Sequence, residues 1–110
     1  MKFKKKKRKF FAGLFKKIQF NDVGKIFLKK NELISFVTEN NSEHDVIRKD
    51  WGFYATQSVN SRLKKNFKTA LVVNSQQKIF IMLVEKKFIN KFKKYCKDEK
   101  QKVMCWLDDL

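Results

Sequence analysis

The chain has 110 residues and a formal net charge of +16 at pH 7, with 43% hydrophobic residues, twelve Phe and two Trp. This length excludes two ordinary domains, and the apolar fraction excludes a wholly disordered basic polymer. The apolar runs are too short for a membrane-spanning helix, which needs about 18 continuous apolar residues.

Positive charge is concentrated in the first part of the chain. Residues 1–30 hold twelve Lys or Arg and one acid, Asp22, whereas residues 31–50 have a net charge of −3 and residues 51–110 a net charge of +8. Such a cluster predicts a polyanionic partner, either nucleic acid or an anionic membrane surface. We therefore expect a basic, partly amphipathic arm over residues 1–20 and a single domain over residues 21–110.

Apolar residues in this arm have the spacing of one stripe on a helix. They are Phe10, Phe11, Leu14, Phe15 and Ile18. The spacing predicts a short amphipathic helix, which Gly13 weakens by about 1 kcal/mol relative to Ala. An extended arm whose aromatic side chains pack on the domain is an equal alternative. Because the apolar run from Phe10 is shorter than a secretory signal core, we expect a non-secreted, cytoplasmic protein.

The next elements along the chain are short strands and turns. Residues 25–28 and 33–38 are rich in β-branched and aromatic residues and flank a polar segment, which predicts a β-hairpin. Further turns are expected at Asn40, Asn41 and Ser42 and at Asn74, because Asn tolerates a left-handed backbone.

His44 is the only histidine in the chain, and it lies between Glu43 and Asp45. The sequence shows no nucleophile or second group that acid–base catalysis would need beside it. We therefore expect His44 in an exposed loop.

The second half of the chain has the clearest element order. Strands are expected at 51–56, 68–74, 78–85 and 103–107, and helices at 58–65 and 88–96. The two middle strands are close enough in sequence to form an antiparallel hairpin. The order strand, helix, strand, strand, helix, strand is the split βαβ pattern of ferredoxin-like domains. The sequence thus predicts an α+β fold, ferredoxin-like from about residue 50, in which two helices pack on an antiparallel sheet. A rearranged α+β sheet is the alternative, because about sixty residues are few for this fold.

The strand expected at 78–85 is apolar on both faces. Ile79, Ile81 and Leu83 alternate with Phe80, Met82 and Val84. Two helices cover only one face of a sheet, so the other face needs a different partner. We expect the hairpin of residues 24–38 to join or cover the sheet, with the N-terminal aromatic residues or a homodimer as alternatives.

The basic residues are the strongest functional signal, because clustered lysines bind phosphates without reading base sequence. The sequence predicts a small, non-enzymatic protein that contacts nucleic acid phosphates. The expected contacts are Lys4, Lys5, Lys6, Lys7, Arg8, Lys9, Lys16, Lys17, Arg62, Lys64 and Lys65. The alternatives are a solvated, flexible tail, an arm bound to an anionic membrane surface, and a homo-oligomeric interaction or regulatory module.

An anion or ligand site is a second hypothesis, at the junction after the strand at 51–56. Its residues are Tyr54, Thr56, Ser58, Asn60 and Arg62. Ordinary helix capping by Ser58 is the alternative. No cofactor, metal or catalytic residue is expected, because Cys96 and Cys105 lack the paired ligand spacing of a zinc site. Both cysteines are expected to be reduced and buried.

Overall fold

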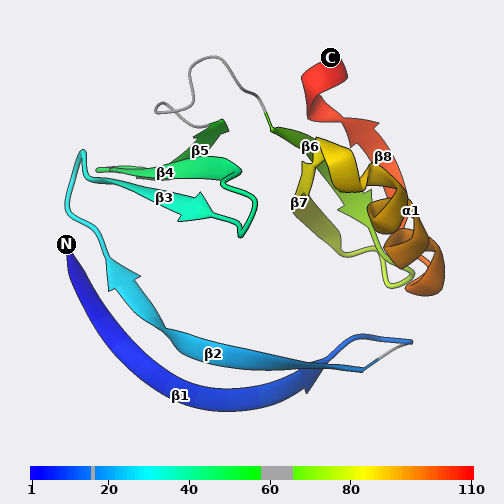
Figure 1. Cartoon of the computed structure of the whole chain (residues 1–110), viewed down its shortest axis with the longest axis horizontal. Coiled ribbons are helices and arrows are strands. Elements are labelled where there is room, and N and C mark those ends of the chain that lie inside the picture. Colours follow the sequence, from blue (N-terminus) through cyan, green and yellow to red (C-terminus); the bar gives the residue numbers. More distant parts are fainter. Residues whose placement is uncertain (16, 58–65) are drawn as a thin grey trace. The chain divides into compact units, whose positions relative to one another are not determined.

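The computed structural model describes residues 1–15, 17–57 and 66–110 (Figure 1). Within these residues, eight strands form three antiparallel sheets, β1-β2, β3-β4-β5 and β7-β6-β8. Two compact units contain them. The first unit takes in residues 1–12 and the described part of 18–65, and the second takes in the described parts of 13–17 and 66–110.

The basic arm is one half of a β-hairpin. Strand β1 (Lys2–Ala12) pairs with β2 (Ile18–Phe27) as a long, curved ribbon (Figure 1). The helix expected over residues 10–18 is therefore wrong. A helical stripe is a local pattern, whereas the aromatic and β-branched residues of both segments favour strands once a pairing partner is present.

The second sheet is a three-stranded meander of β3 (Leu33–Val37), β4 (Glu43–Lys49) and β5 (Gly52–Gln57). The turn before β4 is confirmed, because the Thr38 N–H donates to the Ser42 carbonyl at 3.0 Å and Asn41 has a φ of 61°. The hairpin expected over residues 24–38 is wrong, since β2 pairs with β1 and β3 pairs with β4.

The second unit contains β6 (Phe67–Val73), β7 (Ile79–Glu85), α1 (Ile89–Asp98) and β8 (Lys102–Trp106). Short 3₁₀ turns at Lys86–Phe88 and Leu107–Asp109 precede α1 and follow β8. The antiparallel hairpin of β6 and β7 is confirmed. Its turn is held by the Asn74 side-chain oxygen, which accepts 2.9 Å hydrogen bonds from the N–H groups of Gln76 and Lys78.

One face of this sheet forms the core of the second unit with α1. Ala70 and Val72 of β6 are fully buried there, and Cys96 of α1 is also buried. The Phe92 ring of α1 meets the Trp106 ring of β8 edge-on, with centroids 5.7 Å apart. The apolar stripe of the helix is therefore used as the sequence predicts.

The ferredoxin-like arrangement is wrong. It would place the strand at 52–57 in the sheet of β6, β7 and β8, but β5 pairs with β4 and β8 pairs with β6. The described residues contain one α-helix, α1, and the helix expected at 58–65 lies outside them. The connection from β4 to β5 is only two residues, so this local pairing has a lower loop-closure entropy cost than a distant one.

The sequence predicts that β7 is apolar on both faces and that one face is left without a helix, and this is confirmed for part of the strand. Ile79 and Ile81 are each 58% exposed, and they lie on the face opposite Ala70 and Val72. The hairpin over residues 24–38 does not form, so it does not join this sheet. The sequence-based domain boundary near residue 20 stays a prediction.

We predict that Gly24→Ala destabilises the β1–β2 hairpin by about 3 kcal/mol, the upper end of the cost of a strained backbone position. Gly24 has a φ of 147°, and a Cβ there would collide with the Lys4 carbonyl and lie 2.8 Å from the Phe3 ring. The free energy of hairpin opening, from amide hydrogen exchange of β1 and β2, measures the effect.

Gly52→Ala is the matched control, because Gly52 has a similar φ of 142° but nothing within 4 Å of the added Cβ. We expect it to destabilise the β4–β5 pairing by about 1 kcal/mol, from backbone strain alone. Equal losses for the two variants would contradict the close packing of Phe3 over Gly24.

Candidate nucleic-acid interface

Pairing of β1 with β2 sorts the hairpin side chains onto two faces. Lys2 is opposite Phe27 and Lys4 is opposite Lys25, and Lys9 follows on the same side after the bulge. We call this the basic face. Its members are Lys2, Lys4, Lys9, Phe11, Gln19, Asn21, Lys25 and Phe27.

The opposite side of the ribbon is the aromatic face. Its members are Phe3, Lys5, Arg8, Phe10, Ile18, Phe20, Asp22 and Ile26. The Phe10 and Phe20 rings stack with centroids 5.4 Å apart, and the Arg8 guanidinium lies 4.9 Å from the Phe10 ring centre. Exposed phenylalanines dominate this face.

The Asp22 carboxylate neutralises part of the positive charge of the basic run. Its Oδ2 atom lies 3.5 Å from Arg8 Nε and 3.8 Å from Lys6 Nζ. The same carboxylate accepts a 3.2 Å hydrogen bond from the Gly24 N–H through Oδ1. One carboxylate offsets one unit of this charge, whereas the basic face has four lysines and no acid among its members.

The expected run Lys4–Lys9 is divided by strand geometry. Lys4 and Lys9 lie on the basic face, Lys5 and Arg8 lie on the aromatic face, and Lys6 and Lys7 sit at the bulge between Lys5 and Arg8. Lys17 is exposed in the connection before β2. Four further expected residues fall outside the described part of the chain. They are Lys16, Arg62, Lys64 and Lys65.

Sequence reasoning missed Lys2, Lys25 and Phe27, which the pairing adds to the basic face. The sequence did hold a signal for this pairing. Residues 2–12 and 18–27 are segments of nearly equal length, and a connection of five residues joins them, as in a β-hairpin. A helical interpretation of residues 10–18 concealed that signal.

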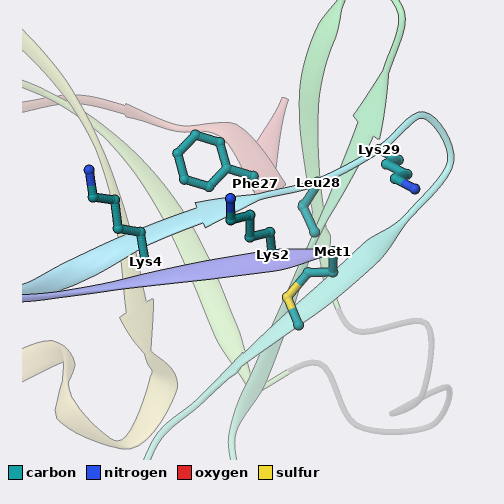
Figure 2. A pocket seen from close by; sticks show the side chains of 6 residues that line it. All are labelled: Met1, Lys2, Lys4, Phe27, Leu28 and Lys29. Carbon is teal, nitrogen blue, oxygen red and sulfur yellow. The ribbon is translucent and has the colours of Figure 1, made fainter.

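A pocket of about 730 Å³ lies at the open end of the hairpin (Figure 2). Its lining residues are Met1, Lys2, Lys4, Phe27, Leu28 and Lys29. The side chains of Lys2, Lys4 and Phe27 rise from the same side of the ribbon (Figure 2), which agrees with their places on the basic face. The pocket is thus an extension of the basic face.

Glu32 ties the chain together beside this pocket. The Met1 ammonium donates to Glu32 Oε2 at 2.9 Å, and the Lys29 N–H donates to Oε1 at 2.6 Å. The hydrogen bond from the Lys29 backbone, followed by the bond from the Met1 ammonium, holds the pKa of Glu32 below its usual value. The carboxylate of Glu32 is therefore kept ionised and engaged by two donors.

The second expected site is only partly described. Tyr54 and Thr56 share one face of β5, and the Trp51 and Tyr54 rings stack with centroids 6.2 Å apart. Ser58, Asn60 and Arg62 lie outside the described residues. The hypothesis of an anion site at this junction stays a prediction.

His44 is not in an exposed loop, so that expectation is wrong. It lies in β4, which is paired on both sides, and only 3% of its surface is exposed. Burial lowers the pKa of His44, while the negative charge of the neighbouring Asp45 opposes that shift. Asp45 is itself fully buried and accepts a 2.5 Å hydrogen bond from the Ser35 hydroxyl.

The described residues contain neither a candidate metal cluster nor a candidate membrane-spanning helix. No group of three or more His, Cys, Asp or Glu side chains there is placed to hold a metal ion. No helix in that part of the chain has the length and apolar content needed to cross a membrane. Cys96 is buried as expected, and burial raises its pKa, whereas Cys105 is only half-buried.

Comparison of the chain with protein-family models, with curated proteins and with solved structures gives no match. Function is therefore inferred from the geometry and charge of the chain itself. The inference is based on the β1–β2 hairpin and the pocket at its open end.

We predict that the protein loses thermal stability as the pH falls from 7.5 to 5.5. The folded pKa of His44 lies below its unfolded value of about 6.5, so the unfolded state binds a proton first. The stabilisation is complete above the unfolded pKa and declines as the pH falls toward the folded pKa. A decrease in Tm over this pH range is therefore expected.

His44→Gln removes the only histidine in the chain, so its Tm should depend less on pH over this interval. The comparison is made by circular dichroism of both proteins across the same pH series. A variant with the same pH dependence as the original protein would show that His44 is not responsible.

Proposed function

We propose that the protein binds nucleic acid through the basic face of the β1–β2 hairpin, by contacts to phosphates that do not read base sequence. The observation that carries this proposal is the row of exposed lysines on one face, Lys2, Lys4, Lys9 and Lys25. Lysine ammonium groups bind phosphates as point charges and release condensed counterions.

The length of the row suits a polymer that carries many charges. Alternate residues of a strand are about 6.7 Å apart, and Lys2 to Lys9 spans about 23 Å. A ribbon of two strands is also narrow enough to enter the major groove of duplex DNA. Several phosphates of one chain can therefore meet successive lysines.

The backbone of the hairpin favours nucleic acid over a membrane surface. Among the described residues, β1 and β2 pair only with each other, so their sheet has two open edges. Polar groups on an open edge are costly to place in hydrocarbon. Along a nucleic acid these edges stay in water. The helical stripe of residues 10–18, which supports the membrane alternative in the sequence, is divided between β1, a connection and β2.

We propose the cytoplasm as the compartment. Cys96 and Cys105 are both free thiols, which is typical of proteins in a reducing environment.

A second copy of the chain is a further proposed partner, supported by the exposed apolar residues of β7. Within the described part of the chain, the sheet order places β7 at an edge, and Ile79, Ile81 and Leu83 of this strand are all exposed. Apolar edge strands pair readily with another chain unless charge or Pro interrupts them. A self-complementary contact through β7 would bury these side chains.

We predict that replacing Lys4, Lys9 and Lys25 together by Gln weakens binding to a single-stranded oligonucleotide by at least tenfold at low salt. Each lost phosphate contact removes about 0.7 from the slope of log K against log salt, so the slope should become shallower by about 2. Fluorescence anisotropy over a salt series measures both quantities.

The matched control replaces Lys78, Lys93 and Lys97 by Gln. These lysines are exposed and belong to the second unit, and their replacement removes the same total charge. It should change the affinity by less than about threefold, the effect of net charge alone. Equal losses for the two triple variants would mean that binding follows net charge and that the basic face has no special role.

For the dimer, we predict that Ile81→Lys converts the protein to a monomer, because a charge would be placed in the shared edge. Sedimentation equilibrium of both proteins gives the masses. Val37→Lys is the control, since Val37 is also exposed but lies on β3. A monomeric original protein would contradict the proposal of a second copy.

A further inference from the structure

We infer that the pocket at the open end of the hairpin receives an unpaired base, which makes single-stranded nucleic acid the ligand class. This inference rests on the proposed function and adds a specific site to it. The pocket has the volume of common small-molecule sites, about 300–1,000 Å³. A single nucleotide offers a planar ring and an anionic group together, and the pocket offers a partner for each.

Phe27 supplies the apolar partner. Its ring is 49% exposed and lies on the basic face, opposite Lys2 in the strand register. Bases of every type stack on an exposed aromatic ring, because every base has a π-face. Leu28 and Met1 are the other apolar residues that line the pocket.

Lysines supply the charge around that ring. Lys2 and Lys4 approach from β1, and Lys29 comes from the segment after β2 (Figure 2). The row continues from Lys4 to Lys25 and Lys9 along the basic face. A strand whose base lies on Phe27 can therefore place its following phosphates along the same row.

Glu32 does not oppose an anion here, because its carboxylate is held by the Met1 ammonium and the Lys29 N–H. The Met1–Glu32 contact also joins the start of β1 to the segment after β2, whereas the Lys29–Glu32 contact lies within that segment.

Single-stranded and duplex nucleic acids differ in whether their bases are paired. A base in a duplex is stacked and paired, and its extrusion into a pocket costs a few kcal/mol. A base in a single strand has no such cost. Both forms still meet the lysines of the basic face, so the pocket adds affinity for single strands only.

The test compares two fluorescent probes with the full chain, a single strand of about 12 nucleotides and a blunt duplex of the same sequence. We expect the single strand to bind about tenfold tighter or more at matched salt. Phe27→Leu should weaken single-strand binding about fivefold or more and leave duplex binding and the salt slope unchanged, because no charge is removed.

Two further variants keep the test interpretable. Phe36→Leu makes the same change on β3, where Phe36 has a similar exposed fraction of 52%, and should leave both affinities unchanged. Phe27→Tyr keeps an aromatic ring and should retain the single-strand affinity. Circular dichroism spectra of all variants should match that of the original protein.

Equal affinities for the two probes, with no effect of Phe27→Leu, would overturn the base pocket and leave phosphate binding by the lysine row intact. Loss of affinity in Phe36→Leu as large as in Phe27→Leu would also overturn it. Binding of neither probe at low salt, or binding only to anionic phospholipid vesicles, would overturn both the base pocket and the proposed function.

Discussion

The backbone pairing of β1 with β2 is the constraint on which the basic face depends. Consecutive lysines in an unpaired chain repel one another and have no fixed direction. In the hairpin, the register from Lys2 opposite Phe27 to Ala12 opposite Ile18 assigns every paired side chain to one face. Gly24 permits this register beside the bulge, because its positive φ and missing Cβ leave room for the Lys4 carbonyl and the Phe3 ring.

The pairing also gives the two faces different chemistry. On the aromatic face, Asp22 lies close to Arg8 and Lys6, and the Phe10 and Phe20 rings stack. On the basic face, the β2 positions opposite the lysines are uncharged or basic, as with Phe27 and Lys25. The ribbon therefore has a cationic side that ends in a pocket with an aromatic wall. The phosphate binding and the selection of unpaired bases that we propose both rest on this one surface.

Local sequence signals located most elements of the second half but, apart from the β6–β7 hairpin, not their pairing partners. The strands at 67–73 and 79–85, the helix at 89–98 and the turns at Asn41 and Asn74 were predictable, because each depends on neighbouring residues. The predicted site contained Lys4 and Lys9 but missed Lys25 and Phe27, which reach the basic face only through pairing. His44 was misplaced for the same reason, since pairing of β4 on both sides buries it.

The sequence by itself determined where the charge lies, which segments are apolar and where Asn permits the chain to turn. These properties are set by side chains and by backbone preferences within a few residues. Only the tertiary structure decided that β1 pairs with β2, that β5 pairs with β4, and which lysines share a face with Phe27. Strand pairing joins residues distant in sequence, and its register depends on the sum of many hydrogen bonds and on one bulge, so no local pattern specifies it.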